Sequence, residues 1–158
     1  MAVFMKVDSA KGGATAKGYE GWTAIHGVSI GAGRHVGVQT AREAYFDNGA
    51  VCFSSVDLSF NHDPMSAGVW THLCKGNVIP SVEINVCHAS DSLQPYLKLI
   101  LEYVVVSDHH TQIVSGGLPH EQITLHCRRI TRTDIFSDGE NGLTQQAVGF
   151  DVGTQQTL

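Results

Sequence analysis

Apolar residues alternate with polar ones over most of this chain, and this period of two constrains the fold more than any other feature. The alternation is cleanest at Val82, Ile84 and Val86. Successive side chains of a strand point to opposite faces, so the pattern predicts β-strands with one buried face. We predict strands at Ala2–Asp8, Gly21–Ile30, Val51–Phe60, Val82–Cys87, Leu97–Val106, Gln122–Ile130 and Val148–Val152. Because Ile130 breaks the parity of its strand, we also predict a β-bulge near Arg128–Arg129.

One segment has helical spacing instead. Met65, Val69 and Leu73 recur at i, i+4 and i+8. Asp63 is suited to the N-cap, and Gly76 follows the last turn as a stop. These signals predict a single helix from Pro64 to Lys75, where Pro64 occupies the first helical position.

A long polar segment, Gly31–Ala50, separates two of the predicted strands. A hairpin connection would need only about two to five residues. We expect either an ordered functional loop or a disordered surface loop, and spacing alone does not separate the two. The segment has few core-type residues and carries the polar side chains Arg34, Gln39, Arg42, Glu43, Asp47 and Asn48.

These elements predict a mainly β protein: an antiparallel barrel or sandwich with one lateral α-helix and a long extended loop. A chain of 158 residues with 42% hydrophobic content has the size of one domain with a real core, so we expect a single domain over residues 1–158.

Charge excludes several partners. The chain has ten Lys and Arg residues against fifteen Asp and Glu residues, and it contains no run of basic residues. This charge balance argues against nucleic-acid binding.

The sequence also argues against membrane insertion. The most apolar stretch, Leu97–Val106, is interrupted by Lys98 and Glu102 and is far shorter than the ~20 residues that span a bilayer. Met1–Lys6 lacks the pattern of a cleavable signal peptide. We therefore expect no membrane insertion and a cytoplasmic protein that would leave its cell by another route.

The sequence contains no recognisable catalytic motif. Its four cysteines, Cys52, Cys74, Cys87 and Cys127, have no metal-ligand spacing and read as buried thiols. Its nine histidines form no H-x-x-x-H pair on the predicted helix, and no phosphate loop or G-x-S-x-G elbow occurs. We predict no catalytic residues, no metal site and no cofactor, which favours a scaffold or binding module over an enzyme.

The order of several segments is similar to that of the hemolysin-coregulated protein (Hcp) family, the inner-tube proteins of type VI secretion systems. The resemblance covers nearly the whole chain and is carried by Phe4–Asp8, Gly12–Trp22, Val56–Phe60, Leu73–Pro80, Tyr96–Leu99 and Gly116–Glu121. One departure lies after Ile130, where this chain has Arg132 and Asp134 in place of an aromatic pair.

The resemblance implies a β-barrel that assembles into homo-hexameric rings, which stack into a tube. It implies the sheath, spike and effector proteins of the secretion system as partners, export without a cleavable signal peptide, and in some systems chaperoning of effectors in the lumen. It also implies that Gly31–Ala50 contacts an adjacent ring. The charged content of 16%, low for a soluble domain, fits a surface covered by neighbours.

Two other classes of function stay open. The first is a monomeric barrel that binds a small ligand, which would need an apolar cavity. The second is a metal-dependent enzyme that uses the histidines.

Overall fold

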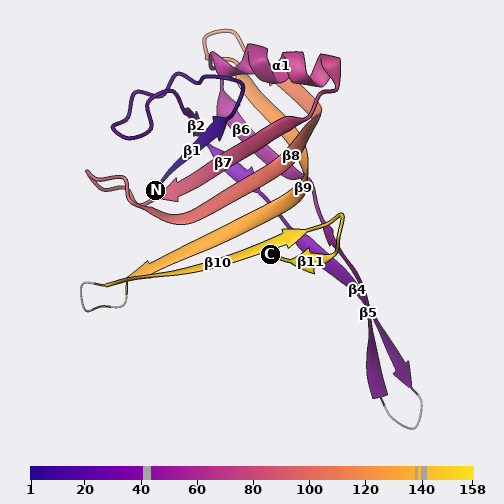
Figure 1. The fold of residues 1–158 in the computed structure, drawn as a ribbon. Coiled ribbons are helices and arrows are strands. Elements are labelled where there is room, and N and C mark those ends of the chain that lie inside the picture. Colours follow the sequence, from indigo (N-terminus) through magenta and orange to yellow (C-terminus); the bar gives the residue numbers. More distant parts are fainter. Residues whose placement is uncertain (41–43, 138, 140–141) are drawn as a thin grey trace.

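The computed structural model describes residues 1–40, 44–137, 139 and 142–158. Within them the chain forms one helix and eleven strands (Figure 1). In chain order these are β1 Ala2–Val7, β2 Thr23–Ile25, β3 Gly27–Ser29, β4 Ala32–Thr40, β5 Ala44–Phe53, β6 Val56–Asn61, α1 Met65–Lys75, β7 Ile79–Cys87, β8 Pro95–Gln112, β9 His120–Ser137, β10 Leu143–Asp151 and β11 Gln156–Thr157.

Antiparallel pairing closes most of these strands into a barrel. β1 pairs with β7, β7 with β8, and β8 with β9. The first half of β9 pairs with β6, and β6 pairs with β3. His26 alone separates β3 from β2, and β2 pairs with β1, so the circuit closes. The predicted strand Gly21–Ile30 is therefore two short strands. β2 pairs with β1 and β3 pairs with β6, so together they close the barrel.

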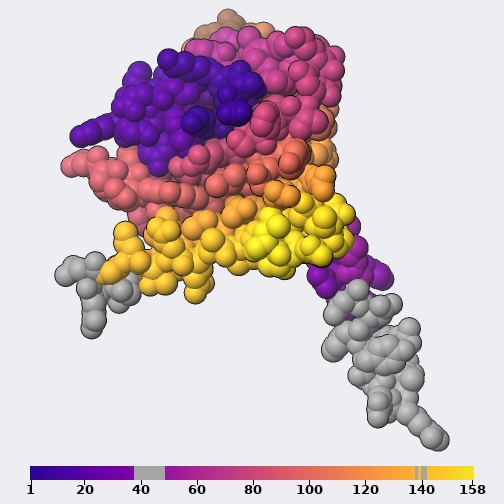
Figure 2. Space-filling model, viewed as in Figure 1, coloured from indigo at the N-terminus to yellow at the C-terminus, as the bar shows by residue number. Residues whose placement is uncertain are grey.

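Two parts of the chain lie outside this circuit. β10 and β11 extend the sheet beyond the second half of β9. β4 and β5 form a separate two-stranded sheet that projects away from the barrel (Figure 1). Figure 2 shows the base of this projection beside the yellow C-terminal residues. The predicted strand Val51–Phe60 is broken by Ser54 and Ser55, because the backbone N–H of Ser54 turns to donate to the Gly31 carbonyl at 2.8 Å and closes the base of the projection.

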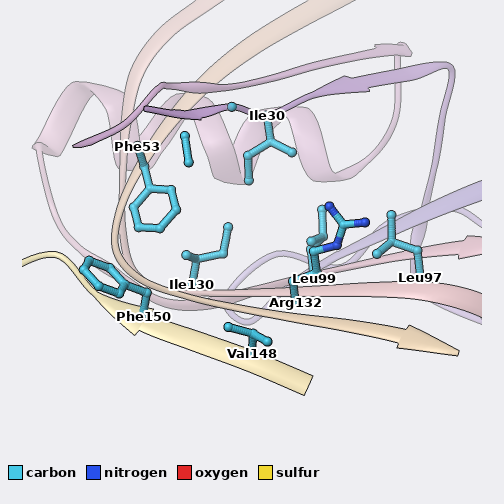
Figure 3. Close-up of a pocket in the computed structure, with 10 residues that line it drawn as sticks. Ile30, Phe53, Leu97, Leu99, Ile130, Arg132, Val148 and Phe150 are labelled. Atoms are coloured by element: carbon cyan, nitrogen blue, oxygen red, sulfur yellow. The ribbon is translucent and has the colours of Figure 1, made fainter. Parts of the chain in front are cut away.

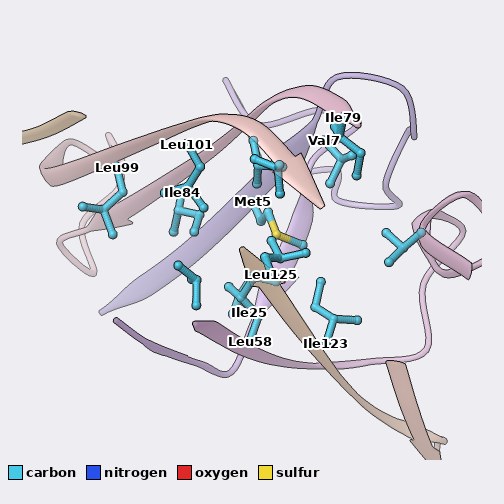
Figure 4. Close-up of a cluster of buried hydrophobic side chains, with 14 of the residues drawn as sticks. Met5, Val7, Ile25, Leu58, Ile79, Ile84, Leu99, Leu101, Ile123 and Leu125 are labelled. Atoms are coloured by element: carbon cyan, nitrogen blue, oxygen red, sulfur yellow. The ribbon is translucent and has the colours of Figure 1, made fainter. Parts of the chain in front are cut away.

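The barrel interior is filled by buried aliphatic side chains (Figure 4). Phe60 is fully buried among them. They come from all walls of the barrel, as the period-two pattern predicts. The side chains with least exposure are Met5, Val56, Leu58, Phe60, Met65, Val69, Ile79, Val82, Ile84, Leu101, Val104, Ile123 and Leu125.

The predicted bulge near Arg128–Arg129 is wrong. The register between β8 and β9 is unchanged there, and the only shift along this pair lies between Val106 and Asp108. Instead, Tyr103 has a φ of 54°, in the left-handed region. In β8 the buried positions change parity across Tyr103, from Leu101 to Val104. In β9 the inward-facing positions change parity at the same level, from Cys127 to Ile130. Both strands therefore change the face that they turn to the core, and neither contains an inserted residue there.

The helix begins and ends close to the predicted residues. Pro64 has helical dihedral angles, and the Oδ1 of Asp63 accepts a hydrogen bond from the Met65 N–H at 3.0 Å. The Oδ2 of Asp63 accepts from the Gly13 N–H, so this carboxylate also ties the loop before β2 to the helix. Gly76 ends the helix in a left-handed conformation, φ 66°, and its N–H donates to the His72 carbonyl.

Gly76 gives a first prediction. A Cβ at this position would meet no heavy atom within 4 Å, so Gly76→Ala costs only backbone strain. We expect it to lower the free energy of unfolding by about 1 kcal/mol, measured by urea denaturation. Gly117→Ala is the control, because Gly117 has open surroundings and no left-handed φ. Equal stabilities for the two variants would contradict the assigned helix end.

Candidate assembly surfaces

The projecting hairpin holds four of the six candidate residues that the sequence suggested. Arg34 lies on β4 near the base, exposed, and its backbone is opposite Val51. Gln39 lies on β4, and Asp47 and Asn48 lie on β5 opposite Gly37 and Val36. Arg42 and Glu43 fall outside the described residues. The structure thus brings the backbones of these candidates into one arm, which is paired as strands where the sequence indicated a loop.

Sequence reasoning missed these strands for a physical reason. A hairpin that leaves the barrel has no face against the core, so nothing requires alternation of apolar and polar residues. Among its described side chains, even Val36 is 47% exposed.

Gln155 holds the base of the hairpin. Its side-chain Nε2–H donates to the Val51 carbonyl at 3.2 Å, and its Oε1 accepts from the Val51 N–H at 3.0 Å. Nε2 also donates to the Val152 carbonyl at 2.9 Å. The amide of Gln155 therefore pairs with β5 as a strand residue would, and it fixes where the hairpin leaves the barrel.

Asp151 anchors the turn that presents Gln155. Its buried carboxylate accepts from the N–H groups of Gly153 and Thr154 at 2.8 and 3.2 Å. Its oxygens also accept from Arg128 and Arg129, at 3.3 and 3.1 Å. Burial opposes ionisation, but these hydrogen bonds prevail and hold the pKa of Asp151 below its ordinary value. Both arginines also lie over the Tyr103 ring, at 5.7 and 5.8 Å from its centroid.

An apolar pocket of about 270 Å³ opens beside the hairpin base (Figure 3). Phe53 and Phe150 meet edge to face across it, with ring centroids 5.7 Å apart. Arg132 lines the pocket, but both of its donating nitrogens bond the Asp134 carboxylate, at 2.8 and 2.9 Å. The remaining lining is mainly aliphatic: Ile30, Ala32, Leu97, Leu99, Ile130 and Val148.

A buried polar cluster lies at the opposite end of the barrel, below α1. Glu121 lies two residues before Ile123 on β9, so its side chain points into the barrel as that of Ile123 does, and it is 3% exposed. Its carboxylate accepts from His62 Nδ1 at 2.8 Å, from His109 Nε2 at 3.3 Å, and from the Ser66 hydroxyl. The cluster joins α1 to β8 and β9. The signal was visible in the sequence, since a carboxylate occupied a core position of a strand.

The histidines do not assemble a metal site. His109 is buried, whereas the others are exposed or half-buried. Across the residues that the structure describes, no group of three or more His, Cys, Asp or Glu side chains could hold a metal ion.

The cysteines are free thiols, but two of them correct the prediction of burial. Cys52 on β5 and Cys74 on α1 are exposed, whereas Cys87 is buried and Cys127 is half-buried. Cys52 leaves the core because it lies on the projecting hairpin.

Within the described ranges, no helix is long and apolar enough to cross a membrane.

Comparisons with solved structures agree on the fold. A type six secretion system protein superposes with a TM-score of 0.90 at 18% identity, covering 99% of each chain. Hcp1 from Salmonella typhimurium reaches 0.82 at 14% identity, covering 99% of this chain and 98% of its own. The secreted protein Hcp3 from Pseudomonas aeruginosa superposes with a TM-score of 0.62 at 17% identity, and the match covers 95% of this chain and 97% of Hcp3. No curated protein matches the chain in sequence.

The sequence itself matches the family described as "Type VI secretion system effector, Hcp" over residues 4–133. That family comprises structural secretion proteins rather than enzymes. Because the match spans most of the 158 residues, this chain belongs to the Hcp family of type VI secretion systems.

Proposed function

We propose that this protein is a structural component of a type VI secretion tube, which forms homo-hexameric rings that stack and are exported. The observation that supports this most directly is the β4–β5 hairpin, an arm with its own sheet that leaves the barrel. An isolated two-stranded sheet is marginally stable in water at best, so such an arm needs a neighbour. We assign the hairpin, with its polar residues, to the contact between adjacent rings.

The remaining parts of the proposal follow from family membership. The protein is not an enzyme and needs no cofactor. It acts as one unit over residues 1–158, is cytoplasmic before export, and is secreted without a cleavable signal peptide. Its partners are other copies of itself and the sheath, spike and effector proteins of the system, and it chaperones effectors in the lumen.

Ring formation is tested by mass in solution. Light scattering at neutral pH and moderate salt should give a species several times heavier than the 17.0 kDa chain. A monomer at high micromolar concentration would contradict the proposal.

The role of the hairpin is tested by replacing residues 35–50 with a short Gly-Ser turn. This keeps Val51 for Gln155 and Phe53 for Phe150, so the barrel retains its contacts. Loop length changes closure entropy by only about 0.6 kcal/mol per doubling, so we expect melting within a few degrees of the parent. Stacking of rings and secretion should be lost.

The control replaces Ala89–Ser92, an exposed turn between β7 and β8, with Gly-Ser residues of equal length. This variant should stack and be secreted as the parent is. Secretion of the hairpin variant would refute its assignment to stacking.

The alternative of a small-ligand barrel is less well supported. The apolar pocket at the hairpin base is slightly smaller than the ~300–1,000 Å³ typical of ligand sites. Its one charged lining residue, Arg132, is already paired with Asp134.

A further inference from the structure

The outer edge of β10 is an unpaired strand edge. β10 pairs with β9 along its whole length, but β11 covers only its last two residues, Phe150 and Asp151. The Gly149 carbonyl accepts from the Leu158 N–H at 2.8 Å, so the backbone groups of Gly149 point away from β9. Backbone groups two residues apart share an edge. Those of Leu143, Gln145 and Ala147 therefore point outward too, and none has a partner among the described residues.

Nothing in this edge discourages pairing. The stretch 143–149 contains no Lys, no Pro and no charged residue, which are the usual protections of an edge strand. Its residues are exposed from Leu143 through Val148, and these two are 68% and 61% exposed. Figure 1 shows β10 as the boundary of the sheet, with nothing beyond its free edge. An uncharged and exposed edge of this kind is open to pairing with a strand of another chain.

The β4–β5 hairpin has matching edges. It is a sheet of two strands, so each strand has one outer edge, and Gln155 covers that of β5 only at Val51. The stretch 36–40 of β4 also lacks charge, so pairing with β10 would bury no ion. Among the strands described, β4, β5 and β10 have long free edges. β8 also lacks a strand partner on its β7 side beyond Val104, but α1 contacts that strand. The hairpin extends away from the β10 edge of its own chain, so a second copy must supply the match.

We infer that the free edge of β10 receives the β4–β5 hairpin of a second copy of this chain through backbone hydrogen bonds. The inference rests on the proposed function, because it names the receptor for the arm. Each copy gives one hairpin and receives another, a heterologous contact that can repeat from ring to ring along a stack. A symmetric β10–β10 contact would leave the edges of both hairpins unpaired.

The first test blocks the edge with Ala147→Pro. Proline removes an N–H that has no partner within the chain, so the barrel should keep its melting temperature within a few degrees. Stacking of rings at a concentration where the parent is fully stacked should be lost. The matched control, Ala147→Val, keeps the N–H and should assemble as the parent does. Leu143→Pro at the start of the strand repeats the test if Ala147→Pro lowers the melting temperature.

The second test locates the contact by cross-linking in a background with Cys52→Ser and Cys74→Ser, which removes the two exposed thiols. Protein carrying Val36→Cys is mixed with protein carrying Gln145→Cys and treated with a short bis-maleimide. Covalent dimers should form in the mixture and not in either protein alone. Leu143→Cys and Ala147→Cys replace Gln145→Cys in parallel reactions, to cover the other registers.

Each outcome decides a separate point. A monomeric parent overturns the proposed function, and this inference with it. Stacks that survive Ala147→Pro and give no mixed dimer overturn the inference alone. Dimers from Gln145→Cys protein by itself overturn it in favour of a symmetric β10–β10 contact.

Discussion

Replacing Glu121 with alanine is expected to lower the free energy of unfolding by about 3–5 kcal/mol at pH 7. The substitution removes a buried carboxylate that accepts hydrogen bonds from His62, Ser66 and His109. Ser66 and His109 are themselves buried, so their donors would be left without an acceptor and out of reach of water. Because the cluster joins α1 to β8 and β9, the helix should loosen first, with faster amide hydrogen exchange in α1.

Glu102→Ala is the matched control. Glu102 is also a carboxylate beside a cation, but its side chain is 38% exposed and lies 3.7 Å from Arg129. Pairs of that kind contribute about 0–1 kcal/mol. Urea denaturation at one protein concentration compares both variants with the parent. Similar stabilities for Glu121→Ala and Glu102→Ala would contradict a structural role for the cluster.

The same carboxylate predicts an acid dependence. Burial raises the pKa of Glu121, but the hydrogen bonds from His62, Ser66 and His109 prevail, so its pKa in the folded protein lies below the ordinary value of 4.5. Such a carboxyl contributes stability above its unfolded pKa and loses it as the pH falls through the folded pKa. The stability difference between parent and Glu121→Ala should therefore shrink as the pH falls below about 4.5. A constant difference down to about pH 3 would contradict the shift.

Phe60→Ala is expected to lower the free energy of unfolding by about 3–5 kcal/mol, because it leaves a cavity in the barrel core. Phe60 has 0% exposure, and its backbone on β6 is opposite Glu121 on β9. For a chain of this length the loss corresponds to a fall of roughly 10 °C in melting temperature, measured by calorimetry. Phe60→Leu preserves most of the volume and should cost much less.

Phe136→Ala controls for the loss of an aromatic ring as such. Phe136 is 55% exposed near the end of β9, so its truncation should change stability by no more than about 0.5 kcal/mol. A Phe60→Ala variant as stable as Phe136→Ala would show that the barrel interior relaxes around the missing ring.

The strands that face the core were predictable, because burial imposes alternation on them. Val82, Ile84 and Val86 are buried on β7, and Met65 and Val69 anchor the helix where their spacing placed it. The resemblance to the Hcp family was predicted from the order of several sequence segments along the chain. The match of the family over residues 4–133 confirms this prediction. The sequence also showed that the candidate residues belong to one segment, since all of them lie within Gly31–Ala50.

The parts that leave the core were not predictable. The described side chains of β4 and β5 are exposed or half-buried, so no burial imposes alternation on them, and their pairing depends on backbone hydrogen bonds that any residue but proline can make. Most of β10 is exposed as well, so its sequence lacks the alternation that burial imposes. Only Val148–Val152, where the strand approaches the core, was predicted as a strand.

The sequence by itself determined the barrel class, the helix and the family, because each depends on local periodicity or on the order of segments. Only the tertiary structure decided that Gln155 pairs with Val51 and that the carboxylate of Glu121 gathers donors from three elements. Gln155 and Val51 are 104 residues apart, and no local pattern relates residues so distant. Such contacts depend on how the closed barrel places its ends in space, which single-strand alternation does not encode.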